Sequence, residues 1–251
     1  MKKLILTSVL SLLTLVNPLS ANAILNGTAV TETEYRTSPL VAIFAVNDSA
    51  GEICSGVLLN GTTILTAAHC FDKSYSYVHI FRSINPYDVS ASRAEIKINN
   101  ADAVLIHPSY NSDVYTYDLA IIKLNKKFPN SNQVIYPILD DSQFNIEEYT
   151  FYGYGDDVNK KFGVLKTAIR SKYKINPTRF GKENSIEFDQ TDLIGISSGD
   201  SGGPVMAIYD DTTFLIAINS TVISVDKEIL GSGSSFVTKV SSSIDWIRSN
   251  M

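Results

Sequence analysis

The dominant pattern along the chain is a series of short apolar stretches separated by turn residues. Fourteen such stretches can be marked, at residues 40–46, 55–59, 62–66, 77–81, 93–98, 103–106, 119–124, 133–138, 149–152, 163–169, 185–188, 204–208, 214–218 and 235–240. Asn60-Gly61 separates two of them, and this dipeptide is a strong signal of a β-hairpin. Many short strands with frequent turns predict an all-β sandwich or barrel, and the pattern alone does not separate these two.

Only the end of the chain has the pattern of a helix. Serines at 241–243 offer capping groups, and Ile244, Trp246 and Ile247 follow at spacings that form one apolar face. The sequence contains no internal repeat, no low-complexity segment and no linker rich in Pro, Gly or Ser. The pattern by itself therefore indicates no domain boundary.

The first 23 residues have the pattern of a secretory signal peptide. Lys2 and Lys3 precede an apolar run at 4–16, and Ala-Asn-Ala at 21–23 fits a small-residue cleavage site. The run is shorter than the ~20 apolar residues that a membrane-spanning helix needs, and no later segment is long and apolar enough. We therefore expect a secreted or periplasmic protein that has no membrane attachment once residues 1–23 are removed.

The charge balance is mildly acidic. The sequence has 21 basic and 26 acidic side chains, which gives a formal net charge of −5. Nucleic acid as the main partner requires a basic patch, so this balance argues against it. The 251 residues are enough for one large β domain or two small ones.

The chain has two cysteines, Cys54 and Cys70. In an exported protein an even number of cysteines favours a disulfide over the alternative of two buried free thiols. No metal-ligand spacing is present, and we expect no metal and no cofactor. Asp156 and Asp157 could contribute to a calcium-binding loop, but a solvated turn is the more common role of such a pair.

One motif can carry nucleophilic chemistry. The segment GDSGGP at 199–204 holds Ser201 on a glycine-rich turn, where a serine is a nucleophile only if a base lies nearby. Among the three histidines we favour His69, which lies between small residues and Cys70, and assign His79 and His107 structural roles.

An imidazole base also needs a carboxylate that orients it. Asp118 directly precedes an apolar run at 119–122, so we expect it to be partly buried, where a charge needs a partner. A simple turn aspartate at a strand start is the alternative.

Together these motifs resemble the trypsin/chymotrypsin family of serine proteases. TAAHC at 66–70, YDLAIIKL at 117–124 and GDSGGP occur in the order His, Asp, Ser, which separates the family from subtilisins and α/β-hydrolases. Further similar segments are IHPSYN at 106–111, GYG at 153–155 and FVTKV followed by IDWI at 236–247.

The resemblance implies a fold, and matching segments span residues 24–247. We expect an all-β, trypsin-like fold of two six-stranded antiparallel β-barrels with a short C-terminal helix. Residues 24–130 would form the N-terminal barrel half and residues 131–251 the C-terminal half, together one peptidase domain with the site between the halves.

The resemblance also implies a mechanism. Ser201 would attack a peptide carbonyl and form an acyl-enzyme, His69 would accept and return the proton, and Asp118 would orient His69. The amide N–H groups of Gly199 and Ser201 would form the oxyanion hole. The expected function is a serine endopeptidase, a monomer that acts on proteins or peptides.

Asp200 has a separate role in the family, where this aspartate pairs with a newly exposed α-amino group. Ile24-Leu25-Asn26-Gly27 resembles the family's I-V-G-G start and follows the expected signal-peptide cleavage site directly. We therefore predict that Ile24 pairs with Asp200 and that signal peptidase itself creates this terminus.

The specificity pocket departs from the trypsin pattern. Gly195 stands where trypsin-like enzymes carry an aspartate, and Val222 and Ser235 fall on two wall positions that are glycine in deep pockets. A narrow neutral pocket would favour a small aliphatic residue before the cut bond of the substrate.

Ser197 stands where many relatives have a cysteine that staples the loop before the nucleophile, so the pocket is less firmly held here. Ser220 is expected beneath the triad, with an ordinary strand serine as the alternative.

Two other functions stay open at this point. One is a catalytically idle member of the fold that only binds a partner, and the other is an esterase, because acyl-enzyme chemistry also cleaves esters. All three triad residues and the oxyanion glycine are present, which favours the active peptidase.

Overall fold

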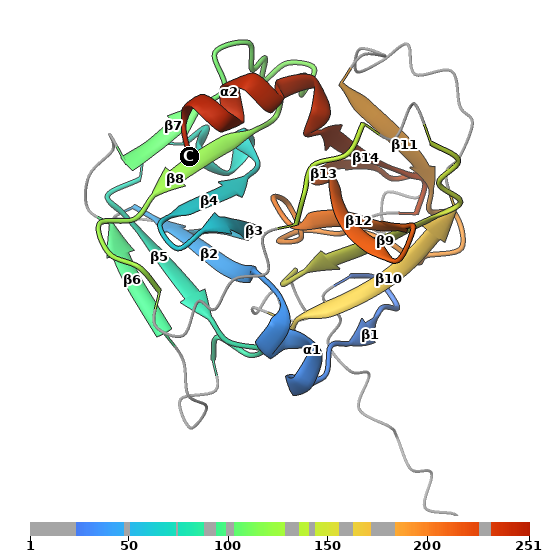
Figure 1. Ribbon diagram of the computed structural model, residues 1–251, viewed down its shortest axis with the longest axis horizontal. Helices are drawn as coiled ribbons and strands as arrows, with labels where there is room; N and C mark the ends of the chain where they lie inside the picture. The colour runs from blue at the N-terminus through green and yellow to red at the C-terminus, as the bar shows by residue number, and fades with distance from the viewer. Residues whose placement is uncertain are drawn as a thin grey trace, which may run out of the picture.

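The computed structural model describes residues 24–47, 51–73, 75–87, 94–98, 103–128, 136–140, 144–155, 163–171, 184–225 and 232–251. The signal peptide predicted at 1–23 and the acidic pair Asp156 and Asp157 lie outside these residues. The described residues form two antiparallel sheets that lie beside each other, with a short helix near the C-terminus (Figure 1).

The first sheet holds seven strands, and every neighbouring pair is antiparallel. Across the sheet the strands are β6 (Ala94–Ile98), β5 (Tyr77–Arg82), β2 (Leu40–Val46), β3 (Gly51–Asn60), β4 (Thr63–Thr66), β8 (Ala120–Lys123) and β7 (Val104–Ile106). Strands β6 and β7 follow each other in the chain but lie at opposite edges. The chain positions of these strands are only six apart, from Ile98 to Val104, which is too short a connection to cross a flat seven-stranded sheet. The two edges must therefore lie close together, as they do in a rolled sheet.

The second sheet is built in the same way. Its order is β1 (Thr28–Ala29), β10 (Lys166–Ser171), β9 (Glu148–Gly153), β12 (Pro204–Tyr209), β13 (Thr212–Ile223), β14 (Ser234–Lys239) and β11 (Ser185–Asp189). Strands β10 and β11 are consecutive in the chain and lie toward opposite edges. The two-residue β1 comes from the start of the described chain and extends the edge formed by β10.

The predicted fold class is confirmed, with a different strand count. Six strands per barrel were expected, and each sheet has seven among the described residues. In the first sheet the count is seven because β6 and β7, which are neighbours in the chain, are separate strands. Strand β6 pairs with β5 at one edge, and β7 pairs with β8 at the other. In the second sheet the additional strand is β1. The division at residue 130 stays a prediction, because residues 129–135 are outside the described part.

The prediction that only the C-terminus is helical was wrong. Helix α2 (Ile244–Ser249) forms as expected, but α1 (Glu32–Thr37) precedes the first long strand. Thr31 and Glu34 form a capping box, in which the Thr31 side chain accepts from the Glu34 N–H and the Glu34 carboxylate accepts from the Thr31 N–H. This T-x-x-E pattern is a helix-start signal that is visible in the sequence. Short 3-10 turns also occur at Ala68–Phe71 and Ser241–Ser243.

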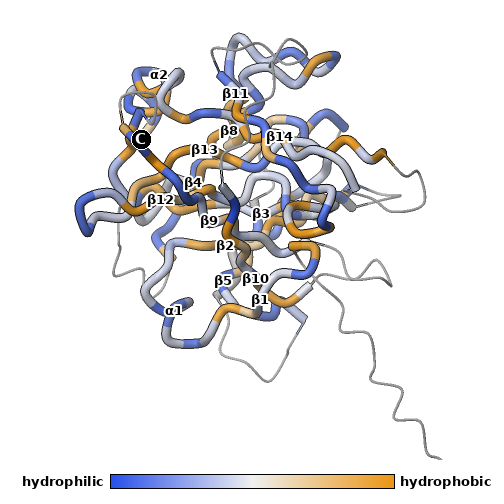
Figure 2. Tube along the Cα trace, turned by 90° about the vertical axis from the view of Figure 1, so that its right-hand side faces the viewer, coloured by the Kyte–Doolittle hydropathy of each residue, from blue (hydrophilic) through white to orange (hydrophobic). Residues whose placement is uncertain are grey.

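The core explains why the two sheets stay together. Each sheet buries its own apolar cluster, but the cluster of the first sheet also includes Met206, Leu215 and Ile218 from the second. Ile247 of α2 is fully buried in the same cluster, so the helix closes over the first sheet. Figure 2 shows hydrophobic segments along the inner strands and hydrophilic ones in the peripheral loops. In the described part of the chain, no helix has the length and apolar character to cross a membrane.

The predicted disulfide between Cys54 and Cys70 is present. Cys54 lies on β3 and Cys70 on the 3-10 turn that also carries His69. Both cysteines are almost fully buried. The bridge therefore fastens the turn of His69 to a central strand of the first sheet.

We predict that removing this disulfide lowers stability without changing the fold. The bridge joins residues 16 apart, and closing a loop of this size contributes about 3 kcal/mol in the chain-entropy account. The Cys54→Ala/Cys70→Ala variant should lose about this much free energy of unfolding in a urea titration. A reductant should destabilise the parent and leave the variant unaffected. Equal urea midpoints for parent and variant would contradict the prediction.

Candidate active site

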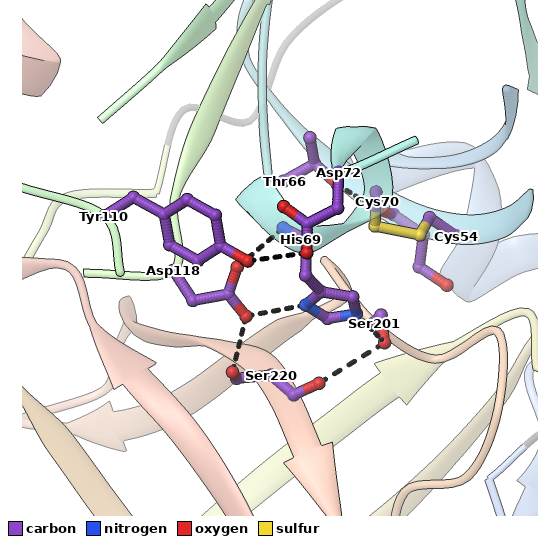
Figure 3. A network of polar contacts seen from close by, with 10 residues as sticks. Cys54, Thr66, His69, Cys70, Asp72, Tyr110, Asp118, Ser201 and Ser220 are labelled. Atoms are coloured by element: carbon purple, nitrogen blue, oxygen red, sulfur yellow. Dashed lines mark hydrogen bonds and ion pairs between the residues drawn. A yellow bond between two sulfur atoms is a disulfide. The ribbon is translucent and has the colours of Figure 1, made fainter. Parts of the chain in front are cut away.

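Three predicted side chains, from separate parts of the chain, meet between the two sheets. His69 lies on the 3-10 turn after β4, Asp118 lies two residues before β8, and Ser201 lies on the turn before β12. His69 Nδ1 is 2.7 Å from Asp118 Oδ2, and His69 Nε2 is 2.8 Å from Ser201 Oγ. Figure 3 shows this continuous line of contacts.

Asp118 is fully buried, and its carboxylate is well supplied with donors. Its Oδ1 accepts from the backbone N–H of His69 at 2.9 Å, and its Oδ2 accepts from Ser220 Oγ at 2.5 Å. The preceding residue Tyr117 has a φ of 50°, which helps to turn the chain so that the carboxylate faces inward. A buried charge is tolerated where it is hydrogen-bonded in this way. The Asp118 carboxylate therefore fixes the ring of His69.

The contact with Asp118 also sets the tautomer of His69. A carboxylate only accepts hydrogen bonds, so Nδ1 carries the proton and Nε2 is free to accept from the Ser201 hydroxyl. Burial of the ring lowers the pKa of His69, but the charge and hydrogen bond of Asp118, with smaller effects of Asp72 and Glu52, raise it above its ordinary value overall. His69 is thus a stronger base than a free imidazole.

The turn that carries Gly199 and Ser201 is held in place by hydrogen bonds to its carbonyl groups. Gly199 has a φ of 88°, which favours glycine. The Gly199 carbonyl accepts from Ser55 Oγ at 2.9 Å, and the Ser201 carbonyl accepts from the Ser55 N–H at 2.7 Å. Within the described residues, the N–H groups of Gly199 and Ser201 donate to no protein group. Two unused donors on one turn can receive a developing negative charge.

Asp200 points the other way, into the second sheet, and is fully buried. Its carboxylate accepts from the backbone nitrogens of Ile24 at 3.1 Å, Gly155 at 2.8 Å and Ser197 at 2.8 Å. The side chain of Ile24 is itself fully buried. The predicted partners Ile24 and Asp200 are therefore adjacent in the structure.

The glycines of the GYG segment make room for this carboxylate. A Cβ atom on Gly153 would lie 2.1 Å from Asp200 Oδ1, and one on Gly155 would lie 2.8 Å from the same oxygen. Neither approach is possible for a side-chain carbon. Both glycines are thus required by Asp200.

The cavity beside Ser201 contains only some of the predicted pocket residues. Ser220 and Val222 line it, and Ile196 lines it as well. Gly195 does not: it forms a β-bridge with Leu25. Ser235 is buried and is the strand partner of Val222, but it does not line the cavity.

Sequence reasoning missed three residues around the site. Ile196 lines the cavity and is 2% exposed, and it directly follows the predicted base position. Tyr115 packs its ring edge against His69 at a centroid distance of 5.6 Å. Tyr110 donates from its hydroxyl to Asp72 at 2.9 Å, beside the His69 turn (Figure 3). Only Tyr110 had a signal, as part of IHPSYN.

Among the residues that the structure describes, no group of three His, Cys, Asp or Glu side chains is placed to hold a metal ion.

The chain is similar in sequence to several curated proteins. Tissue-type plasminogen activator of Bos taurus is 25% identical over 237 residues, covering 83% of this chain and 41% of that protein, and the Homo sapiens protein is 26% identical with 84% and 42% covered. A venom serine protease of Polistes dominula is 34% identical over 107 residues, 41% of this chain and 38% of that protein. The chain thus spans about two fifths of the length of these curated relatives.

Structural comparison agrees with the fold. A solved structure of HL collagenase superimposes with a TM-score of 0.71 at 24% identity, covering 90% of this chain and 98% of that one. The sequence profile of the family described as Trypsin matches residues 25–247, which is most of the chain. The protein therefore belongs to the trypsin/chymotrypsin family of serine proteases.

Proposed function

We propose that the protein is a secreted serine endopeptidase that cleaves proteins or peptides through an acyl-enzyme. The observation that carries this proposal is the unbroken line of short contacts from Asp118 through His69 to Ser201. Family membership supports protein or peptide substrates. The idle-binder alternative gains no support from this geometry, because all three groups lie within hydrogen-bond reach.

The proposed mechanism follows from the roles that the distances allow. His69 Nε2 accepts the proton of Ser201 Oγ, 2.8 Å away, as that oxygen bonds to the substrate carbonyl carbon. The carbonyl oxygen becomes an oxyanion and accepts from the N–H groups of Gly199 and Ser201. His69 then gives its proton to the leaving amine, and the acyl-enzyme forms. Water attacks in the second half with the same proton transfers.

The first test replaces the nucleophile. Ser201→Ala should lower kcat/KM for peptide cleavage by roughly 10⁴-fold or more, since the base is left without a nucleophile. Ser76→Ala, at an exposed serine before β5, is the matched control and should cleave like the parent. Products are read by mass spectrometry on a mixed peptide library. Silence from parent and variant alike would favour the idle binder, and turnover of esters without peptides would favour the esterase.

Secretion and activation are proposed to share one cleavage. The backbone nitrogen of Ile24 already lies 3.1 Å from the buried Asp200 carboxylate, so a free α-amino group there would form a buried ion pair. That pair would order the turn that holds Gly199 and Ser201. The predicted cleavage after residue 23 by signal peptidase would release this terminus with no separate propeptide.

N-terminal sequencing tests this proposal directly. Edman degradation of the active, exported protein should read Ile-Leu-Asn-Gly, beginning at Ile24. An active protein that begins at any other residue would exclude the shared cleavage.

The cavity supports a preference for small aliphatic residues before the cut bond. Ile196 and Val222 line the cavity, where they would limit the room for a longer side chain. Glu52 lines the cavity too, but it comes from β3 of the first sheet, whereas these two residues belong to the second half of the chain. The narrow pocket is thus attributed to Ile196 and Val222.

A peptide library tests the pocket. The parent should cut mainly after Ala or Val. The Ile196→Gly variant should raise the preference for Leu or Phe over Ala by about tenfold, because it removes a side chain that lines the cavity. Val225→Gly, at a 75% exposed residue, is the control and should keep the parent's preference. Equal cleavage by the parent after Arg and after Ala would contradict the proposed pocket.

A further inference from the structure

A second cavity lies between α1 and the outward face of the second sheet. Its lining shares no residue with the cavity beside Ser201. Figure 1 shows α1 at the bottom of the view, between the two sheets. We call this cavity the α1 groove, and six of the residues that line it are Glu34, Leu40, Tyr136, Tyr152, Met206 and Ile208.

The register of the second sheet places more apolar surface beside this groove. Thr150 of β9 lines the groove and is paired with Met206 of β12 and with Ile169 of β10, so these side chains lie on one face. Ile208 lies two residues beyond Met206 and therefore on the same face. Ile208 is 69% exposed and Ile169 is 59% exposed. Two large apolar side chains thus stay in contact with water on the face that carries the groove.

The size of the groove fits a single side chain. Leu40 and Met206 line it and are buried, and Tyr136 and Tyr152 add two aromatic rings. Its volume is about 190 Å³. A cavity of roughly 150 Å³ holds a benzene ring, whereas pockets for drug-sized ligands enclose about 300–1,000 Å³. One aromatic or large aliphatic side chain of a polypeptide therefore matches the groove better than a larger free ligand does.

The charge in the groove is negative. Glu34 is the one charged residue among the described residues that line it. Hydrogen bonds with Thr31 lower the pKa of Glu34, so its carboxylate is ionised at neutral pH. The basic residue of α1, Arg36, forms an ion pair with Glu32 at 3.0 Å. The groove therefore presents a carboxylate and no basic side chain of its own.

Further carboxylates extend this negative charge along the same face. Glu148 is exposed and lies two residues before Thr150, on the same face of β9. Asp210 and Asp211 are exposed and form the turn that follows the end of β12 with Ile208. The apolar groove is thus accompanied by acidic residues on two strands.

We propose that the α1 groove binds an extended segment of a partner protein that carries one large apolar or aromatic side chain flanked by Lys or Arg. The apolar side chain enters the groove, and its basic neighbours face the carboxylates. A second copy of this chain is a poor occupant, because the like charges of two such faces repel each other. This binding goes beyond the proposed peptidase activity and does not require Ser201.

The test uses the Ser201→Ala protein, so that no probe is cleaved, and measures binding by fluorescence anisotropy. The probe is the labelled peptide Gly-Lys-Gly-Arg-Phe-Arg-Gly-Lys-Gly. Two matched peptides replace either Phe with Ser, or every Lys and Arg with Glu. The groove is changed by Ile208→Lys and, separately, by Glu34→Gln, which can keep the capping box. Val225→Lys adds the same charge at another exposed apolar residue, outside the groove, and is the matched control.

We expect the probe to bind the Ser201→Ala protein at least about tenfold more tightly than either matched peptide, and more weakly as salt is added. Ile208→Lys should weaken this binding by about tenfold, Glu34→Gln by about threefold, and Val225→Lys by less than about twofold. Equal affinity with and without Ile208→Lys, an equal loss in Val225→Lys, or no binding at millimolar concentration would overturn the proposal.

Two further measurements identify the occupant. With the probe bound, hydrogen exchange should slow in residues 34–40 and 204–209, and slowing in residues 197–201 alone would overturn the proposal by placing the probe at the triad. In sedimentation without the probe, a dimer that Ile208→Lys dissociates would overturn it by assigning the groove to a second copy. All measurements use the Ser201→Ala protein, so a parent that cleaves no peptide contradicts the proposed function and leaves this result unchanged.

Discussion

The buried carboxylate of Asp200 is the constraint around which the second half of the site is arranged. It is fully enclosed, and a carboxylate in that position must find donors. The backbone nitrogens of Ile24, Gly155 and Ser197 provide them, from three separate segments of chain. Hydrogen-bonding this one carboxylate therefore brings together the segment at Ile24, the GYG turn and the turn that carries Ser201.

Asp118 has the corresponding function in the first half. It is buried equally well, but its donors are the backbone and ring of His69 and the hydroxyl of Ser220. Ser220 lies on β13 of the second sheet, so this carboxylate also joins the two halves. In the proposed mechanism, Asp200 shapes the turn that receives the oxyanion, and Asp118 orients the histidine that accepts the proton. Ser201 stands where the two arrangements meet.

The fold class could be predicted from the sequence, and so could the meeting of His69, Asp118 and Ser201, because these predictions depend on short local motifs. His69, Asp118 and Ser201 each lie in a short segment whose small or apolar neighbours are needed locally. The pocket was harder to predict, since its walls come from loops whose register depends on distant partners. Gly195 pairs with Leu25, and this contact turns Ile196 into the cavity, which no local pattern indicates.

The same distinction applies to other elements. Helix α1 had a readable capping box, whereas the crossing of the chain between β6 and β7 could not be read from apolar alternation. Lys166 looks like an ordinary strand lysine in the sequence. Its position opposite Gly153 emerges only from the pairing of β9 with β10.

Ser55 illustrates what this arrangement means for the molecule as a whole. From the middle of β3 its N–H donates to the Ser201 carbonyl, and its hydroxyl donates to the Gly199 carbonyl while accepting from the Tyr154 N–H. A single strand residue of the first sheet thus holds two turns of the second. The halves cannot separate like hinged modules without breaking the nucleophile turn. Melting of either half should therefore be cooperative with melting of the other, and a partly opened intermediate would be catalytically silent.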